Sequence, residues 1–188
     1  MPPGKITTIV GANAPSGLAS RPIRILLCDE VDRYPFSAGA EGDPVNLARK
    51  RTVTFWNRKI VLVSTPTIRG LSRIEREFEA SDQRRYFVPC PHCGAMQWLK
   101  FDRLRWQKGR PETAEYHCEG CETPIAEHHK TAMLEGGEWR ATATAADPTT
   151  VGYHLSALYS PIGWLSWERI VRSWEAAQGS DEAIKAFR

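Results

Sequence analysis

An acidic pair, Asp29 and Glu30, follows directly after the apolar run Ile25–Cys28. A fully apolar run of this length indicates a strand buried on both faces, as in parallel sheets. An α/β sheet binds its ligands at the carboxyl ends of such strands. There, one carboxylate can hold Mg²⁺ on the phosphates of a nucleotide, and the other can orient or deprotonate an attacking water. The alternative is a strand that simply ends in polar turn residues.

A second apolar run supports the first interpretation. Residues 58–63 are rich in β-branched side chains and are followed by Ser64, Thr65, Pro66 and Thr67. Pro66 cannot continue a sheet, so this strand is predicted to end there. Hydroxyl groups at the tip of a neighbouring strand can contact the γ-phosphate of a nucleotide held by the acidic pair. The two strands therefore predict one phosphate-handling edge.

Four cysteines form a second group with a chemical signature. They occur as two C-x2-C pairs separated by 24 residues: Cys90 and Cys93, then Cys118 and Cys121. Each pair can present two thiolates to one ion, and four thiolates form the tetrahedral set that Zn²⁺ prefers. Gly94 and Gly120 are expected to supply the positive φ angles of two tight turns. The spacing predicts a structural zinc site in a ribbon, because four thiolates leave no open position for a catalytic water.

Other readings of the cysteines are weaker. Disulfides do not fit a chain without a secretory signal, and a redox site needs one C-x2-C pair rather than two. His92 and His117 lie beside the cysteines and could replace one ligand. Cys28, inside an apolar run, is expected to be a small core residue.

Composition is ordinary for a globular protein of 188 residues, with 41% hydrophobic residues and a net charge of +3. The longest apolar runs are too short for a membrane span. The net charge alone does not imply nucleic acid. Arginines at 69, 73, 76, 84 and 85 could meet phosphates, but they alternate with acidic residues and favour a solvated, salt-bridged face. Most tryptophans are expected to cover the core and the ribbon surface, whereas Trp98 and Trp106 could contact DNA or a partner.

Several short sequence segments resemble the gpA-type large subunit of tailed-phage terminases, and they occur in colinear order over most of the chain. They are Gly11–Pro15, Leu18–Arg24, Asp29–Pro35, Glu41–Pro44, Ser64–Thr67, Ser81–Tyr86, Cys90–Cys93 and Leu155–Pro161. The resemblance implies a motor that hydrolyses ATP to pump double-stranded DNA into a procapsid, with a concatemer-cutting nuclease downstream. By this resemblance, Asp29 is the Walker B magnesium ligand and Glu30 the catalytic base. Ser64 and Thr65 would lie in the coupling motif.

The resemblance also implies cofactors and partners. These are Mg²⁺ and ATP in the full-length protein, double-stranded DNA, the small terminase subunit and the portal protein. A homo-oligomeric motor acting in the host cytoplasm, with no membrane association, is expected.

The sequence departs from the family pattern in lacking a phosphate-binding P-loop. Leu18 and Ala19 stand where its lysine and hydroxyl residue would follow the Gly11–Gly17 segment. We therefore expect Met1 to lie inside a larger motor domain, and this chain alone to show little or no ATPase activity. The last helix, with Ile184 and Phe187 on its inner face, also indicates truncation. The acidic nuclease cluster is expected beyond Arg188.

The expected fold is α/β, in three parts. Residues 1–86 form part of a P-loop-type ATPase sheet, with strands near 6–10, 23–28 and 59–64 and helices near 44–54 and 71–81. Residues 87–126 form the zinc ribbon. Residues 127–188 form a small α+β segment with a short helix ending at Gly136, a strand around Trp139, a strand-like stretch over Val151–Leu158 and a helix capped by Ser166.

Two other functions remain open at this stage. One is a non-catalytic zinc-ribbon module that binds DNA or protein and carries a degenerate ATPase remnant. The other is a fragment of a helicase-like ATPase from outside phages. The acidic pair Asp29 and Glu30 and the hydroxyl pair Ser64 and Thr65 argue against the first function. The terminase-like segments beyond the Walker B strand argue against the second.

Overall fold

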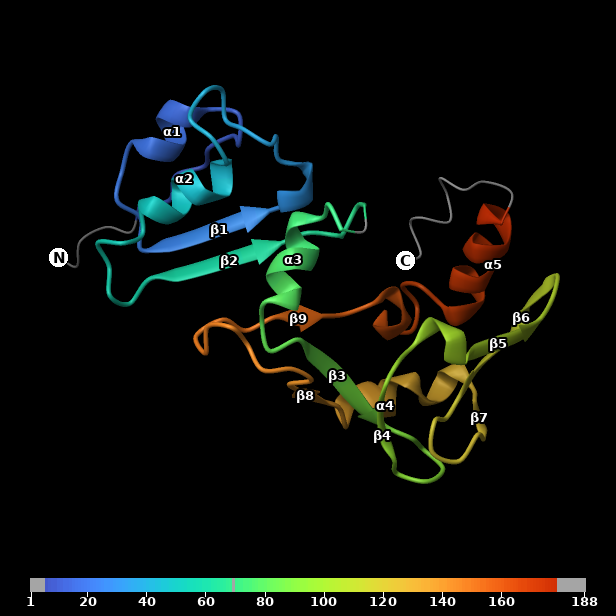
Figure 1. Cartoon of the computed structure of the whole chain (residues 1–188). Helices are drawn as coiled ribbons and strands as arrows, with labels where there is room; N and C mark the ends of the chain where they lie inside the picture. The colour runs from blue at the N-terminus through green and yellow to red at the C-terminus, as the bar shows by residue number, and fades with distance from the viewer. Residues whose placement is uncertain (1–5, 69, 179–188) are drawn as a thin grey trace. The chain divides into compact units, whose positions relative to one another are not determined.

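The computed structural model describes residues 6–68 and 70–178 (Figure 1). The chain divides into two compact units between Glu75 and Arg76, so the division falls within helix α3 (Arg73–Glu79). The fold is mixed α/β, as the sequence predicts. Among the described residues, no helix is long and apolar enough to cross a membrane.

Unit 1 is built around one pair of parallel strands. Its elements before α3 are α1 (Pro15–Ala19), β1 (Ile25–Asp29), the 3-10 helix η1 (Val31–Arg33), α2 (Pro44–Lys50) and β2 (Lys59–Val63). Strands β1 and β2 pair in register from Ile25 opposite Lys59 to Asp29 opposite Val63 (Figure 1). Both strands therefore end at the same edge.

Helix α2 covers one face of this strand pair. Asp43 caps the helix by accepting a hydrogen bond from the backbone N–H of Asn46 at 2.8 Å, and Pro44 occupies the first turn. Val45 of α2 packs with Cys28 of β1 in a small buried cluster. Cys28 is thus a buried core residue, as predicted.

The prediction that β1 is buried on both faces is wrong. Cys28 faces the cluster under α2, whereas Leu27 is 72% exposed and Val63 of β2 is 54% exposed. The reason is that α2 covers one face only, and no other element among the described residues of unit 1 buries the second face. Alternate residues of a strand point to opposite faces, so half of the apolar run remains exposed.

Two further sequence predictions in unit 1 need correction. Residues 6–10 form no strand, because they pair with no other strand, and Ile9 is 95% exposed. The helix expected over 44–54 ends at Lys50. There the Thr52 hydroxyl donates to the carbonyl of Arg49 at 2.8 Å, a local bond of the kind that competes with helix continuation.

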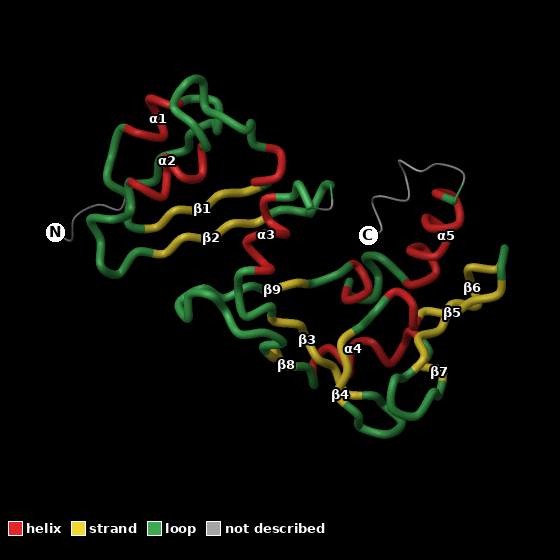
Figure 2. Tube along the Cα trace, in the orientation of Figure 1, coloured by secondary structure: helices red, strands yellow, loops and turns green. Residues whose placement is uncertain are grey.

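The described residues of unit 2 form two small sheets, and two further α-helices follow α3. Figure 2 shows these helices and strands along the chain. After α3 the elements of unit 2 are β3 (Arg84–Pro89), β4 (Met96–Trp98), η2 (Phe101–Arg103), β5 (Leu104–Gln107), β6 (Arg110–His117), β7 (Pro124–Ile125), η3 (Glu127–His129), α4 (Lys130–Glu135), β8 (Glu138–Arg140), β9 (Tyr153–His154), η4 (Ala157–Tyr159) and α5 (Trp167–Ala177). One sheet has the order β4-β3-β8, with β9 parallel to β3, and the other has the order β5-β6-β7. Of the predicted stretch Val151–Leu158, only β9 is a strand, because only Tyr153 and His154 pair with β3.

Helix α5 closes the core of unit 2. The Ser166 side chain caps the helix by accepting from the backbone N–H of Arg169 at 3.2 Å, as predicted. Trp167, Ile170 and Val171 form its buried stripe, and they join the core that also holds Cys90 and Cys118. The predicted inner residues Ile184 and Phe187 lie outside the described residues.

A buried ion pair fixes the start of this helix. Lys130 is completely buried, and its ammonium group lies 2.5 Å from Glu127 Oε1. The same carboxylate oxygen accepts a hydrogen bond from the backbone N–H of Trp167 at 3.1 Å. Glu127 therefore links α4 to the first turn of α5.

Candidate functional site

The edge where β1 and β2 end brings the predicted acidic and hydroxyl residues together. Asp29 lies opposite Val63 in the strand pair, so Glu30 and Ser64 both follow directly at this edge. The Ser64 hydroxyl accepts a hydrogen bond from the backbone N–H of Asp32 at 3.2 Å. Asp29 and Glu30 are exposed, as their proposed chemistry requires.

The backbone of Glu30 has an unusual conformation. Its φ of 53° and ψ of 44° lie in the left-handed region, which costs a residue with a side chain of order 1–3 kcal/mol. The Glu30 N–H donates to Oδ1 of Asp29 at 3.0 Å. Such strained positions cluster at functional sites, because the strain persists only where the surrounding structure imposes it.

Asp32 is a structural centre of this edge that sequence reasoning did not single out. One oxygen, Oδ1, accepts from the backbone N–H of Ile74 at 2.8 Å. The other, Oδ2, accepts from the N–H and the hydroxyl of Thr67 at 3.0 and 3.2 Å. Burial alone would raise the pKa of Asp32, but hydrogen bonds from Ser72, Ile74 and Thr67 outweigh it and lower the pKa. Asp32 therefore joins the two strand ends to the first turn of α3 as a carboxylate.

Arg73 completes this network, rather than meeting phosphates. Its guanidinium lies 2.6 Å from Oδ2 of Asp43, the residue that caps α2, and donates to the carbonyl of Val31. Arg84 is likewise paired, with Asp82 at 2.7 Å. Both arginines form ion pairs, as predicted, but Arg73 does not lie on a solvated face, because its side chain is only 12% exposed and its partner caps another helix. The sequence feature that could have indicated this role is the position of Arg73, eight residues after Thr65 and in the first turn of the next predicted helix.

The strand-end residues supply hard oxygen ligands. Carboxylates and hydroxyls are the groups that Mg²⁺ prefers, so Asp29 and its neighbours fit this ion chemically. The sequence contains no Gly-x4-Gly-Lys-Ser/Thr segment to bind the phosphates of a nucleotide. A hollow of about 640 Å³ lies far along the chain in unit 2, where Arg105, His117 and Glu168 are among its lining residues, and none of the strand-end residues lines it.

The four predicted cysteines converge in unit 2. Their Sγ atoms all lie within 4.8 Å of one another. The Sγ atoms of Cys90 and Cys121 are 3.9 Å apart, and those of Cys93 and Cys118 are 3.8 Å apart. These distances are much longer than a disulfide bond of about 2.05 Å. A tetrahedron with Zn–S bonds of about 2.3 Å has S···S edges of about 3.8 Å, so the four thiols could hold a metal ion of this size.

The two cysteine turns repeat one hydrogen-bonding pattern. In the first, the N–H of Gly94 donates to the carbonyl of Cys90 at 2.9 Å, and the N–H of His92 donates to its sulfur at 3.4 Å. In the second, Glu122 and Gly120 make the same bonds to Cys118, at 3.1 and 3.3 Å. Each of the two turns, here called a knuckle, therefore presents its first cysteine in the same way.

The repeat corrects one detail of the prediction. Gly94 has a φ of 73°, as expected, but the equivalent left-handed residue in the second knuckle is Glu122, with a φ of 57°. Gly120 instead lies where there is little space for a side chain. A Cβ atom there would lie 3.0 Å from the Cβ of Ala95 in the first knuckle, a contact tighter than most.

The histidines beside the cysteines lie outside the ligand cluster. Nε2 of His92 is 3.2 Å from the carbonyl oxygen of Pro124, and His117 lines the hollow described above. Burial raises the pKa of the Cys90 thiol to about 12. A bound cation would favour the thiolate, which is the form that binds metal.

Comparison with known proteins places the chain in a family. Residues 1–139 match the family described as phage terminase large subunit gpA, ATPase domain. The chain belongs to the gpA family of phage terminase large subunits. Residues 150–188 match the endonuclease domain of the same large subunit. The resemblance inferred from the sequence is thus confirmed.

Two curated relatives extend over nearly the whole gpA-type chain. This chain is 28% identical over 204 residues to the large terminase subunit of Enterobacteria phage P21. It is 28% identical over 200 residues to the large terminase subunit of Escherichia phage lambda. Each alignment covers 95% of this chain and 31% of the relative, so the chain spans about a third of their length. No solved structure matches the chain.

Proposed function

We propose that this chain forms part of an ATP-driven motor that packages double-stranded DNA into procapsids. The observation that carries the proposal is the edge where β1 and β2 end, which brings Asp29 and Glu30 beside Ser64 and Thr65. Membership of the gpA family supports the same reading. The sheet is then part of a P-loop-type ATPase core, with the phosphate-binding loop supplied by residues outside this chain.

Each strand-end residue has a defined task in this proposal. Asp29 binds Mg²⁺, which would neutralise charge on the β- and γ-phosphates of ATP. Glu30 orients or deprotonates the attacking water, a contribution of typically 10²–10⁴ in rate. Both residues are exposed, and the backbone is left-handed at Glu30.

The hydroxyl residues couple hydrolysis to movement. Ser64 accepts a hydrogen bond from the backbone of Asp32, and the Asp32 carboxylate holds Thr67 and the first turn of α3. A shift of Ser64 or Thr65 on loss of the γ-phosphate would therefore be transmitted to α3. This is the relay to DNA translocation in our proposal.

The four cysteines hold one Zn²⁺ with a structural role, because a closed set of four thiolates leaves no position for a reacting water. The corresponding organisation is a partial ATPase domain over 1–86, a zinc ribbon over 87–126 and a segment over 127–188, of which residues 150–188 match the nuclease domain. Double-stranded DNA, the small terminase subunit and the portal are the proposed partners. A homo-oligomeric motor in the host cytoplasm follows from the same assignment.

The first experiment is to read about 150 codons upstream of Met1, in the same frame, for a P-loop of the form Gly-x4-Gly-Lys-Ser/Thr or a variant. The protein extended by these residues should hydrolyse ATP, and Glu30→Gln should lower turnover about 100-fold or more while ATP still binds. Glu41→Gln is the matched control, because Glu41 is also an exposed carboxylate of unit 1.

The outcome separates the two functional readings. Turnover that Glu30→Gln leaves intact would remove Glu30 from catalysis. An extended protein that binds zinc and DNA but never hydrolyses ATP would favour the non-catalytic zinc-ribbon module. Stop codons directly upstream would favour it as well.

A further inference from the structure

The sheet β4-β3-β8 presents an outer face that is rich in cations and aromatic rings. Side chains of β3 alternate between the two faces, so Tyr86 and Val88 point into the core of unit 2, whereas Arg85 and Phe87 lie on the opposite side. We define the cationic face as the outer-face residues Arg85, Phe87, Trp98, Lys100, Arg140 and His154.

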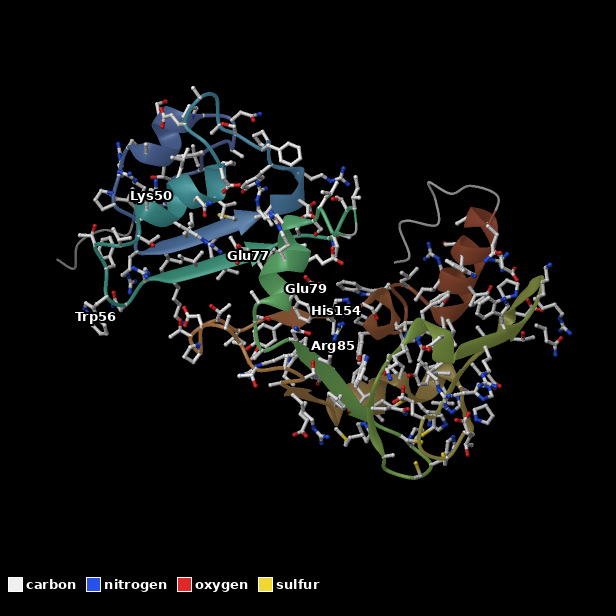
Figure 3. The ribbon with its side chains drawn as sticks, in the orientation of Figure 1. Lys50, Trp56, Glu77, Glu79, Arg85 and His154 are labelled. Carbon is white, nitrogen blue, oxygen red and sulfur yellow. The ribbon has the colours of Figure 1, made fainter. Side chains whose placement is uncertain are left out.

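Its central feature is a row formed by two arginines on neighbouring strands, with a histidine beside them whose lowered pKa leaves it uncharged at neutral pH. Arg85 of β3 lies directly opposite Arg140 of β8, and on its other side it is paired with His154 of β9. Figure 3 shows Arg85 and His154 close together. Residues directly opposite in a sheet point to the same face, and like charges in that position are destabilising. The row therefore carries an electrostatic cost that a bound anion would relieve.

Arg85 has no internal counter-ion. Among the described residues no carboxylate forms an ion pair with it, and its guanidinium instead lies over the ring of Phe78, 5.0 Å from the centroid. Burial lowers the pKa of Arg85. Burial and then repulsion by Arg85 lower the pKa of His154. A half-buried guanidinium without a carboxylate partner points to an anionic ligand from outside the chain.

Aromatic rings hold the remaining cations in place. The Arg140 guanidinium lies 5.1 Å from the centroid of the Phe87 ring, and the Lys100 ammonium lies 4.0 Å from that of Trp98. Phe87 and Trp98 themselves meet edge to face, with centroids 5.3 Å apart. The rings thus form a continuous support from Arg140 to Lys100.

The carboxylates on this face are weakly held. Glu138 pairs with Arg140 at 2.5 Å, and Glu119 pairs with Lys100 at 2.7 Å. Both pairs are solvent-accessible, and such surface pairs contribute only about 0–1 kcal/mol. A DNA phosphate could therefore replace either carboxylate as the partner of the cation at little cost.

We propose that the cationic face binds the phosphate backbone of duplex DNA. Neighbouring strands lie about 4.8 Å apart, so Arg85 on β3 and Arg140 on β8 lie close enough to contact neighbouring phosphates of one DNA strand. The choice of duplex DNA among polyanions rests on the proposed packaging function, whereas the cation row does not.

The test is the salt dependence of binding to a short random-sequence duplex, measured by fluorescence anisotropy with the zinc-loaded chain. Each phosphate contact contributes about 0.9 to the slope of log affinity against log salt. The double variant Arg85→Gln/Arg140→Gln should lower this slope by about 2, and the exposed single variant Arg140→Gln by about 1. Arg85→Lys/Arg140→Lys keeps the charge and should retain most of the slope.

The control removes the same charge elsewhere in unit 2. Arg110→Gln/Arg172→Gln neutralises two exposed arginines that are also paired with glutamates, and the slope should stay unchanged. Equal losses in the two double variants, an unchanged slope in the single Arg140→Gln variant, or no DNA binding by the wild-type chain would each overturn the inference. The assay contains no ATP. A failure of ATP hydrolysis in the extended protein would therefore contradict the motor and leave this result standing.

Discussion

Substituting Cys118 by serine should remove the metal and weaken unit 2. Cys118 is completely buried, and its sulfur lies 3.8 Å from that of Cys93 on the other knuckle. A hydroxyl is a poor ligand for a site built from thiolates, so the variant is expected to lose stoichiometric zinc. In the proposed site the metal would join the turn between β3 and β4 to the turn between β6 and β7, and would thus link the two sheets.

The size of the effect follows from this cross-link. The chain-entropy relation for closing the segment from Cys93 to Cys118 gives about 3.5 kcal/mol, if the metal acts only as a tie. Structural zinc in small domains contributes about 10 kcal/mol or more, so 3.5 kcal/mol is a lower bound. For a unit of about 100 residues, this bound corresponds to a fall of roughly 15–25 °C in Tm.

The assay combines metal analysis with a thermal melt. Six of the seven tryptophans lie in unit 2, so the near-ultraviolet signal reports mainly on that unit. Cys28→Ser is the control, because Cys28 is a buried cysteine of unit 1 outside the cluster, and it should leave one zinc per chain. Full zinc retention by Cys118→Ser would refute the four-cysteine centre. A melt of the tryptophan signal that is insensitive to chelation would refute the structural role.

Two other predictions concern single contacts. Asp32→Asn should lower the free energy of unfolding by about 1.5–3 kcal/mol near pH 7, because an amide cannot accept all three hydrogen bonds that the carboxylate accepts. Since the pKa of Asp32 is lowered in the folded state, this stabilisation is present above the unfolded pKa and is lost as the pH falls through the folded value; urea denaturation at pH 7 and pH 3 should show the wild type and the variant converging, and a constant gap would contradict the assignment. Lys130→Met should cost about 3–5 kcal/mol by leaving the Glu127 carboxylate without its buried partner, and adding Glu127→Gln should recover part of it in the same assay. A Lys130→Met variant as stable as the wild type would show that the pair carries no net stabilisation.

Patterns within a few residues predicted the site best. The C-x2-C spacing identified all four clustered thiols, and the two apolar runs identified β1 and β2 with their polar ends. Ser166 and the apolar spacing after it identified α5. In each case the local chemistry of the chain determines the element, so the sequence contains the information.

Features that depend on distant partners were not predicted. The role of Asp32 depends on Thr67 and Ile74, which lie 35 and 42 residues away, and no local pattern distinguishes it from Asp29. The exposure of Leu27 depends on what covers the second face of the sheet, which the strand itself does not encode. The row formed by Arg85 and Arg140 appears only when β3 and β8 pair in register.

The left-handed backbone at Glu30 has a consequence for how this edge trades stability against activity. Glycine adopts that conformation without steric penalty, so a chain optimised for thermal stability alone would carry glycine at position 30. Glu30→Gly should therefore raise the melting temperature of unit 1 while removing the carboxylate. The wild-type glutamate lowers the free energy of unfolding, and substitutions at this strand end that raise stability are expected to lower the proposed hydrolysis.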